Sequence, residues 1–406
     1  MNKSNERTMW QLPWGFRESI ATAVGVIIIG VSLQLAVGSF NFYLLSQPVN
    51  LVVAIVIIIL STVCGLASRK SQLAKWIAGV PLSTSLICAL LGLSAIMGLV
   101  LQQSESTTTI GLDSMTSNWA FVLIYTMVLI ALGSVIVRRA THFKIKDYAF
   151  YLNHLGLWIL LASSGLGYSD MERYIMHIQE GETEWRVYDA NNTIKELPIA
   201  IKLLDFDMEV YPPKLAIIDR ATGAVQPEES PQFLQLDNEV ISEVINGWHI
   251  EVKEYIHNAV RNSDSTYRAM PMAGATPAAN ITVSKNGLIH SGWVCGGNSA
   301  QLYMTIALDQ EFRVVMTTPE PRTFSSEVEV FAQDGSKKSG KIEVNHPLTI
   351  GHWMIYQYGY DNEAGKLSSY SSFELVFDPY IKIVYLGIIM LMAGSACMIW
   401  SKKGRV

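Results

Sequence analysis

Residues 148–168 read YAFYLNHLGLWILLASSGLGY and contain no acidic or basic side chain except His154. An α-helix of about 20 apolar residues, rising about 1.5 Å per residue, crosses the hydrocarbon layer of a bilayer. The stretch follows a basic run, residues 138–146, and ends where a long polar segment begins. It is therefore predicted to be a transmembrane helix that joins the two halves of the molecule. His154 is the only histidine predicted to lie inside the membrane.

The composition of the 406-residue chain is typical of an integral membrane protein. Half of the residues are hydrophobic and 16% are charged, whereas about 25% are charged in soluble domains. Further apolar runs long enough to span a membrane lie at about residues 20–40, 51–67, 76–101, 119–137 and 381–400. The first of them is too long for the apolar core of a signal peptide and is predicted to be an uncleaved anchor.

Basic residues gather in alternate connections between the six predicted spans. They precede the first span and follow the second, fourth and sixth, whereas loops 41–50 and 102–118 contain no Lys or Arg. Basic loops stay on the cytoplasmic side of a membrane, so both termini are predicted to be cytoplasmic. Residues 169–379 then lie outside, in the periplasm of a bacterial cell. We expect a multi-pass protein of the bacterial cytoplasmic (inner) membrane.

The outer segment, residues 169–379, is acidic and rich in strand patterns. It has 30 Asp and Glu against 16 Lys and Arg, a formal charge of −14, which either attracts a basic partner or only solvates the surface. Partial two-residue alternation predicts strands at residues 198–206, 248–255, 302–308, 312–316, 327–331 and 373–377. We expect a large antiparallel β-rich domain, two-layer or sandwich-like, in which residues 258–279 form a loop.

These patterns predict an α-helical membrane bundle of six transmembrane helices with one large β-rich periplasmic domain. Residues 1–168 are the membrane domain with five transmembrane helices, and residues 169–379 are the periplasmic domain. Residues 380–406 hold the sixth transmembrane helix and a cytoplasmic tail.

His154 has two interpretations. An imidazole inside a span is costly to bury and faces protein or a cavity. It is either an axial ligand to a metal or haem through a neutral ring nitrogen, or a hydrogen-bonded packing residue between helices. Tyr151 and Trp158 share roughly one helix face with it and are candidates to line a flat apolar cofactor, as are Phe150, Leu157 and Leu161.

The remaining histidines and cysteines give weaker signals. His142 lies in a basic loop and is interpreted as an ordinary residue of that loop, so a bis-histidine site would need a ligand from another subunit. The four cysteines are scattered, and Cys295 is alone in the outer segment, which excludes a disulfide within it. We interpret Cys295 as part of a structural turn, not a reactive thiol, and expect it to be dispensable for haem attachment.

Three stretches occur in a characteristic order. They are residues 153–157 (NHLGL), residues 344–348 (VNHPL) with Gly351 and residues 355–361 (IYQYGYD), and residues 378–387, which begin DP and contain VYLG. In this order they resemble the ResB-like (CcsB or Ccs1) cytochrome c biogenesis proteins of system II. The resemblance covers roughly residues 76–400. Family members commonly have four spans, so the hairpin at residues 20–67 is additional here.

The resemblance implies a subunit of a haem-delivery and cytochrome c synthase (haem lyase) complex. Such a complex presents haem b to the CxxCH motif of apocytochrome c on the periplasmic side. The chain has no WWD-type tryptophan run, so the implied partner is a separate CcsA/ResC-type membrane protein, and this chain is the non-WWD subunit. Whether that subunit is itself an enzyme stays open.

By the same resemblance, His154 is a haem ligand shared with a histidine of the partner. From their spacing on the helix, Tyr151 and Trp158 are then expected to line the haem face. The chain is expected to bind the CcsA/ResC-type partner, apocytochrome c and the lipid bilayer. It is not expected to bind nucleic acid. The alternative is a membrane-anchored periplasmic sensor or assembly platform without a cofactor.

Overall fold

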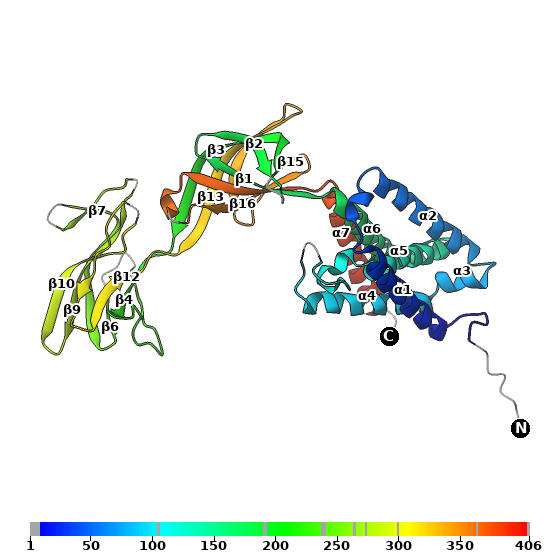
Figure 1. Ribbon diagram of the computed structural model, residues 1–406, viewed down its shortest axis with the longest axis horizontal. Coiled ribbons are helices and arrows are strands. Elements are labelled where there is room, and N and C mark those ends of the chain that lie inside the picture. The colour runs from blue at the N-terminus through cyan, green and yellow to red at the C-terminus, as the bar shows by residue number, and fades with distance from the viewer. Residues whose placement is uncertain are drawn as a thin grey trace, which may run out of the picture. The chain divides into compact units, whose positions relative to one another are not determined.

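The computed structural model describes residues 9–103, 106–189, 193–236, 241–262, 265–272, 274–298, 300–362 and 364–403. The chain forms two compact units, one of helices and one of strands (Figure 1). The helical unit comprises Met1–Glu172 and Phe377–Val406, and the strand unit comprises Arg173–Val376.

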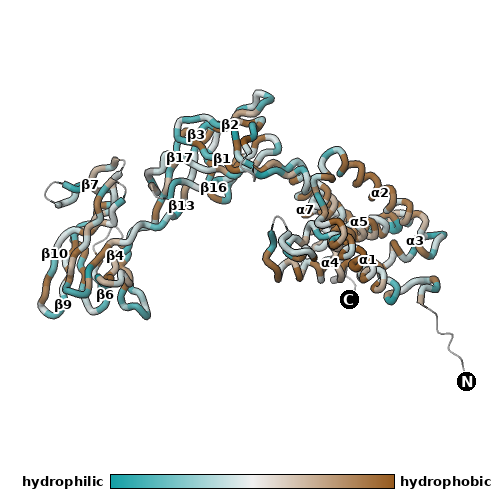
Figure 2. The backbone as a smooth tube through the Cα atoms, in the orientation of Figure 1, coloured by the Kyte–Doolittle hydropathy of each residue, from teal (hydrophilic) through white to brown (hydrophobic). Residues whose placement is uncertain are grey.

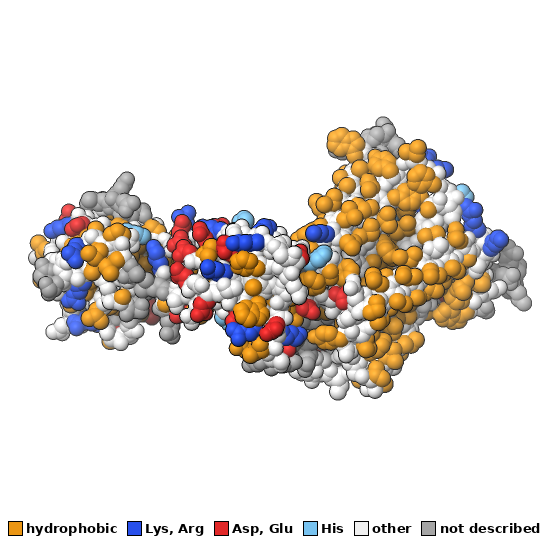
Figure 3. All heavy atoms as spheres, turned by 90° about the horizontal axis from the view of Figure 1, so that it is seen from above, with side chains coloured by type: hydrophobic (Ala, Val, Ile, Leu, Met, Phe, Trp, Pro, Cys, Tyr) orange, Lys and Arg blue, Asp and Glu red, His pale blue; other side chains and the backbone are white. Residues whose placement is uncertain are grey.

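The helical unit is built from long apolar helices. Its described α-helices are α1 (Phe16–Val37), α2 (Val49–Ala67), α3 (Gln72–Ile77), α4 (Val80–Leu99), α5 (Trp119–Ala140), α6 (Tyr148–Gly167) and α7 (Ile381–Lys403). All but α3 are long and apolar enough to cross a membrane, which confirms the six predicted spans. Figure 2 shows these helices as mainly hydrophobic, and Figure 3 shows hydrophobic side chains covering the visible face of the unit. A largely apolar face on helices of membrane-spanning length indicates a multi-pass membrane protein.

The third span begins later than predicted. The sequence favours one helix over residues 76–101, but the helix is interrupted between Ile77, the last residue of α3, and Val80, the first residue of α4. A Cβ added to Gly79 would lie 2.9 Å from the carbonyl oxygens of Lys75 and Trp76, so the backbone turns too tightly here for a side chain. Pro81 then lies in the first turn of α4, where its missing N–H leaves no helical hydrogen bond unmade.

The basic connections meet at one end of the helical unit. Arg69, after α2, donates from Nη2 to the carbonyl oxygen of Thr141, after α5, at 2.9 Å. At the other end, the backbone N–H of Phe40 donates to the carbonyl oxygen of Ser117 at 2.8 Å. The loops that lack Lys and Arg are therefore segregated from those that contain them. This geometry agrees with the charge alternation read from the sequence.

The α6 and α7 helices pack very closely because glycines of each helix lie in the interface between them. A Cβ added to Gly156 or Gly387 would lie 2.6 or 2.7 Å from a backbone nitrogen of the facing helix. At Gly394 it would collide with the backbone of Asn153. Asn153 also donates from Nδ2 to Ser395 Oγ at 2.8 Å. Small residues let two membrane helices approach in this way and fix their register.

A polar cluster joins the start of α2, in the hairpin of α1 and α2, to the C-terminal end of α6 and the N-terminal end of α7. Asn50 Nδ2 donates to Asp170 Oδ2 at 2.6 Å, and the Tyr380 hydroxyl donates to the same oxygen at 3.1 Å. The backbone N–H of Gln47 donates to Asp170 Oδ1 at 2.9 Å. The additional hairpin is thus bound to the two segments through which the chain leaves and re-enters the helical unit.

The strand unit is a large antiparallel β structure with three sheets. The first has the order β14-β13-β3-β2-β1-β17-β16-β15, the second β10-β9-β7-β6 with β8 beside β7, and the third β11-β12-β4-β5. The strands are β1 (Glu172–Gln179), β2 (Thr183–Tyr188), β3 (Ile194–Val210), β4 (Lys214–Asp219), β5 (Leu234–Gln235), β6 (Ser242–Ile245), β7 (Trp248–Arg261), β8 (Tyr267–Ala269), β9 (Thr276–Lys285), β10 (Leu288–Cys295), β11 (Ile306–Ala307), β12 (Phe312–Met316), β13 (Pro321–Ala332), β14 (Lys337–Glu343), β15 (Leu348–Ile350), β16 (Trp353–Tyr360) and β17 (Tyr370–Phe377).

The second and third sheets share one hydrophobic core. Its buried members include Ile217 on β4, Trp248 and Ile250 on β7, Ile281 on β9 and Val314 on β12. Alternate residues of these strands point into the core, as the two-residue period predicts. These two sheets form the predicted sandwich. The eight-stranded sheet is a further element that the sequence patterns do not separate from it.

Two strand predictions need correction. Residues 258–279 are predicted as a loop, yet they contain the end of β7, all of β8 and the start of β9; residues 263, 264 and 273 lie outside the described residues. Register shifts in β7, between Val252 and Glu254 and between Ile256 and Ala259, break the two-residue alternation that would reveal a strand. The predicted strand at 302–308 is reduced to Ile306–Ala307.

A buried polar network lies within the eight-stranded sheet. Gln357 on β16 donates from Nε2 to Ser371 Oγ at 2.6 Å, and Ser326 donates to the same oxygen at 2.8 Å. Both serines are fully buried and Gln357 is 9% exposed. A polar group that is buried without a hydrogen-bond partner destabilises the folded state more than one that water can solvate. The hydrogen bonds of this network therefore hold β13, β16 and β17 in place relative to one another.

Replacing Gln357 with leucine is expected to lower the free energy of unfolding by about 1–3 kcal/mol, because the buried Ser371 hydroxyl loses the amide donor that binds it at 2.6 Å. Thermal unfolding of the full-length protein in detergent measures this. Gln179→Leu, at an exposed position on β1, is the matched control and should be nearly neutral. Equal melting temperatures for Gln357→Leu and the parent would show that the network contributes nothing to stability.

Candidate functional site

His154 lies two turns into α6 and is half-buried. Its Nδ1 is 3.1 Å from the carbonyl oxygen of Phe150, one turn earlier. The Phe150 ring stacks on the imidazole with a centroid distance of 3.9 Å. In the neutral tautomer that donates from Nδ1 to this carbonyl, Nε2 keeps its lone pair. The ring is thus held in one orientation, with its second nitrogen available to a metal or a hydrogen-bond donor.

A cavity of about 790 Å³ lies beside His154, between α4, α5, the α5–α6 connection and α6. Its size falls within the ~300–1,000 Å³ of typical small-molecule pockets. The apolar part of the lining comes from three helices and includes Val80, Ile87, Leu132, Val135, Phe150 and Leu157. Such walls suit a flat apolar ligand.

One part of this lining is strongly basic. Arg138, Arg139, His142, Lys144 and Lys146 line the cavity together with a single carboxylate, that of Asp147. Arg139 pairs with Asp147 at 3.1 Å and lies 4.5 Å above the centroid of the Phe150 ring. Within the described part of the chain, Lys144 and Lys146 form no ion pair. The cavity therefore combines apolar walls, one imidazole nitrogen and an excess of positive charge that suits a ligand bearing carboxylates.

The two predicted lining residues, Tyr151 and Trp158, lie outside the residues that line this cavity. Tyr151 packs against Phe143, with ring centroids 5.5 Å apart. Trp158 donates from Nε1 to the carbonyl oxygen of Leu129 at 3.1 Å and packs between α2 and α5. Their role against haem stays a prediction, as does that of His154. Phe150 and Leu157, predicted on the same face, do line the cavity.

Sequence reasoning missed the contribution of the α5–α6 connection. His142 is interpreted there as an ordinary loop residue, but it lines the cavity that also contains His154. The basic run 138–146 directly before the histidine-bearing helix is the signal that could have revealed this. Local charge counting assigns such a run to membrane orientation alone, and only the fold shows that it borders a cavity.

Comparison with protein families matches residues 285–371 to the ResB-like family. The predicted resemblance to this family is confirmed. None of the curated proteins compared with the chain matches it. The ResB-like family supports a general role in cytochrome c biogenesis for this protein.

The ResB-like segment runs from the end of β9 to the start of β17. It contains the VNHPL turn between β14 and β15, where Asn345 adopts a positive φ of 64°, and the IYQYGYD stretch on β16. Gln357, which donates to Ser371 in the buried network, belongs to this stretch. These residues lie in the eight-stranded sheet, whereas the cavity beside His154 lies in the helical unit.

Cys295 is fully buried at the end of β10. The four cysteines are all free, and Cys295 Sγ accepts a weak hydrogen bond from the backbone N–H of Gly297 at 3.4 Å. A buried thiol in apolar surroundings is inert. This environment agrees with a structural turn, and its dispensability for haem attachment stays a prediction.

Proposed function

We propose that this chain is the non-WWD subunit of a system II cytochrome c synthase complex and holds haem b in the cavity beside His154. The observation that carries the proposal is the orientation of that imidazole. Its Nδ1 is engaged by the Phe150 carbonyl at 3.1 Å, which leaves Nε2 as the ring nitrogen available for a ligand, and the residue lines a cavity with apolar walls. A neutral imidazole nitrogen is the usual protein ligand of haem iron.

Each part of the lining fits one part of haem b as cargo. The apolar walls suit the porphyrin face, and Phe150 holds the imidazole from one side. The unpaired ammonium groups of Lys144 and Lys146 suit the two propionate carboxylates. A CcsA/ResC-type partner would supply the second axial ligand, and the complex would present haem to the CxxCH motif of apocytochrome c in the periplasm.

The absorption spectrum of the purified complex tests the proposal. The full-length protein, coexpressed with its WWD partner and purified in detergent, is expected to carry haem and to show a Soret band. An intact but colourless complex would instead support the alternative, a periplasmic assembly platform without cofactor.

The proposed orientation has both termini in the cytoplasm and the strand unit in the periplasm. With a membrane-impermeant maleimide added to intact cells, Leu44→Cys is expected to be labelled and Lys70→Cys to be protected. These positions lie in loops at opposite ends of the helical unit, one without and one with basic residues. Labelling of Lys70→Cys in intact cells would show that the orientation is the reverse of the proposed one.

A further inference from the structure

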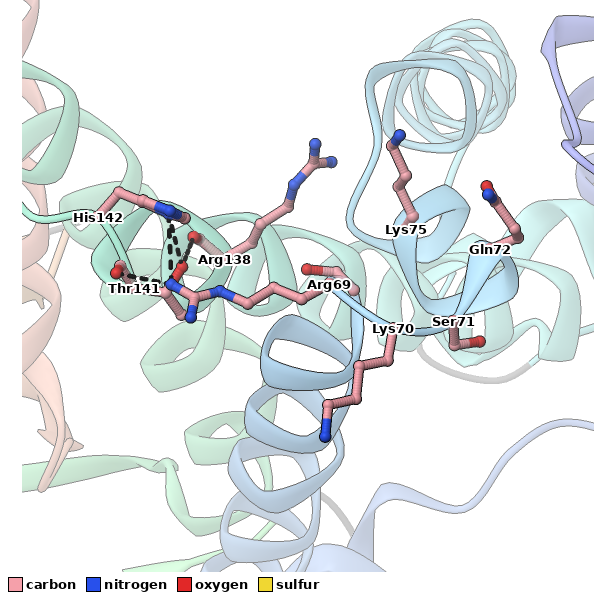
Figure 4. Close-up of a pocket in the computed structure, with 9 residues that line it drawn as sticks. Arg69, Lys70, Ser71, Gln72, Lys75, Arg138, Thr141 and His142 are labelled. Atoms are coloured by element: carbon pink, nitrogen blue, oxygen red, sulfur yellow. Dashed lines mark hydrogen bonds between the residues drawn. The ribbon is translucent and has the colours of Figure 1, made fainter.

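A second cavity, of about 370 Å³, lies where α2, α3 and α5 come together (Figure 4). Lysine or arginine supplies four of its nine lining residues: Arg69, Lys70, Lys75 and Arg138. The remaining described lining residues are polar, and none is Asp or Glu. Cations gathered around a hollow without a carboxylate repel one another, so an anion bound there would lower the electrostatic energy.

Two of these cations are held in place by the backbone. Arg69 Nη2 donates to the carbonyl oxygen of Thr141 at 2.9 Å and lies 3.4 Å from His142 Nδ1. Arg138 Nη1 donates to the carbonyl oxygen of Ala78 at 2.8 Å. Each arginine thereby connects two of the helix ends that form the cavity. The fold thus holds the guanidinium groups of Arg69 and Arg138 at the cavity.

The other two cations lack a counter-ion. Lys70 and Lys75 form no ion pair in the part of the chain that the structure describes. Figure 4 shows Lys75 and Arg138 extending to one side, while Lys70 extends the opposite way, along α2. The ammonium group of Lys70 is therefore placed where the polar rim of the cavity meets the outer surface of a membrane-spanning helix.

The exposed face of α2 points to the kind of anion. Ile59, Val63 and Leu66 are 55%, 57% and 55% exposed, and their spacing places them on one helix face that continues to Lys70. This apolar stripe leads to the cationic cavity at the end of α2. A ligand that binds both the cationic cavity and the apolar stripe has a phosphate at one end and a hydrocarbon chain at the other. A membrane phospholipid has this structure.

We propose that this cavity binds the headgroup of an anionic phospholipid, with an acyl chain along the α2 stripe. Arg138 and His142 line both this cavity and the one beside His154, so the lipid phosphate would lie against their shared wall. The proposal does not depend on haem binding.

Titration of the full-length protein in neutral detergent with dioctanoyl phosphatidylglycerol tests it, with thermal stability as the readout. Loss of two surface cations, each contributing about 1 kcal/mol to anionic-lipid binding, predicts about 30-fold weaker binding for Lys70→Gln/Lys75→Gln. Arg17→Gln/Lys382→Gln removes the same charge from exposed positions of the helical unit outside the cavity and should bind like the parent.

The control ligands separate the possible sources of the anion. Dioctanoyl phosphatidylcholine and millimolar inorganic phosphate are both expected to leave the melting temperature unchanged. Equal stabilisation by phosphatidylcholine or by phosphate alone would overturn the proposal, since the headgroup charge or the acyl chain would then be irrelevant. Equal weakening in the two double variants would also overturn it, because the effect would then come from net charge.

Discussion

Replacing His154 with glycine is expected to remove most of the haem that copurifies with the complex while leaving the protein folded. Loss of residues that only support a metal ligand typically weakens metal binding about 10–100-fold, so loss of the ligand itself should weaken it at least about tenfold. His154 has no hydrogen bond to another helix in the described structure, and its Nδ1 contacts only its own helix. The variant should therefore stay folded, with a stability loss of at most about 1 kcal/mol from the glycine in the middle of α6.

Added imidazole should restore part of the haem and part of the cytochrome c maturation of His154→Gly, because a free ligand can enter the vacated space. The measurements are haem per complex from the Soret absorbance and holocytochrome yield in cells. His257→Ala, which removes an exposed histidine of the strand unit, is the matched control and should match the parent in both. A folded His154→Gly complex with the parent haem content would show that His154 is a packing residue.

Replacing Gly394 with leucine is expected to have the largest effect on the assembly of the helical unit. The first side-chain carbon would already collide with the backbone of Asn153, and a backbone cannot move away as a flexible side chain can. The α6 and α7 helices would have to separate, which also breaks the hydrogen bond from Asn153 to Ser395. We expect a destabilisation above the ~1–3 kcal/mol of ordinary overpacking.

The yield of monodisperse protein in size-exclusion chromatography and its melting temperature measure this effect. Gly92→Leu is the matched control, because a Cβ at Gly92 on α4 meets no atom within 4 Å. Leucine favours helix over glycine by nearly 1 kcal/mol, so the control should be neutral or slightly stabilising. Parent-like yield and stability for Gly394→Leu would contradict the close α6–α7 contact. Since Asn153 precedes His154, loss of haem should accompany the loss of packing.

The location of the membrane helices was readable from the sequence because it depends on local properties. A span needs only enough consecutive apolar residues to cross the hydrocarbon layer, and six such runs are present. The same reasoning placed His154 inside a helix and predicted strands such as Phe312–Met316, whose bounds the structure reproduces. The motifs of the ResB-like segment are likewise contiguous in sequence, so the family resemblance needed no fold.

Other features depend on which distant segments come together, and only the tertiary structure decided them. The α3–α4 break depends on how closely the backbone at Gly79 approaches the preceding turn. The strands within residues 258–279 form because β7 supplies partners across its register shifts. The cavity beside His154 needs α4, α5 and α6 side by side, and it includes His142 and the basic connection that charge counting assigned to orientation alone. Apolar length and strand period are properties of one segment, whereas a cavity, a helix contact or a strand pairing is a property of two or more.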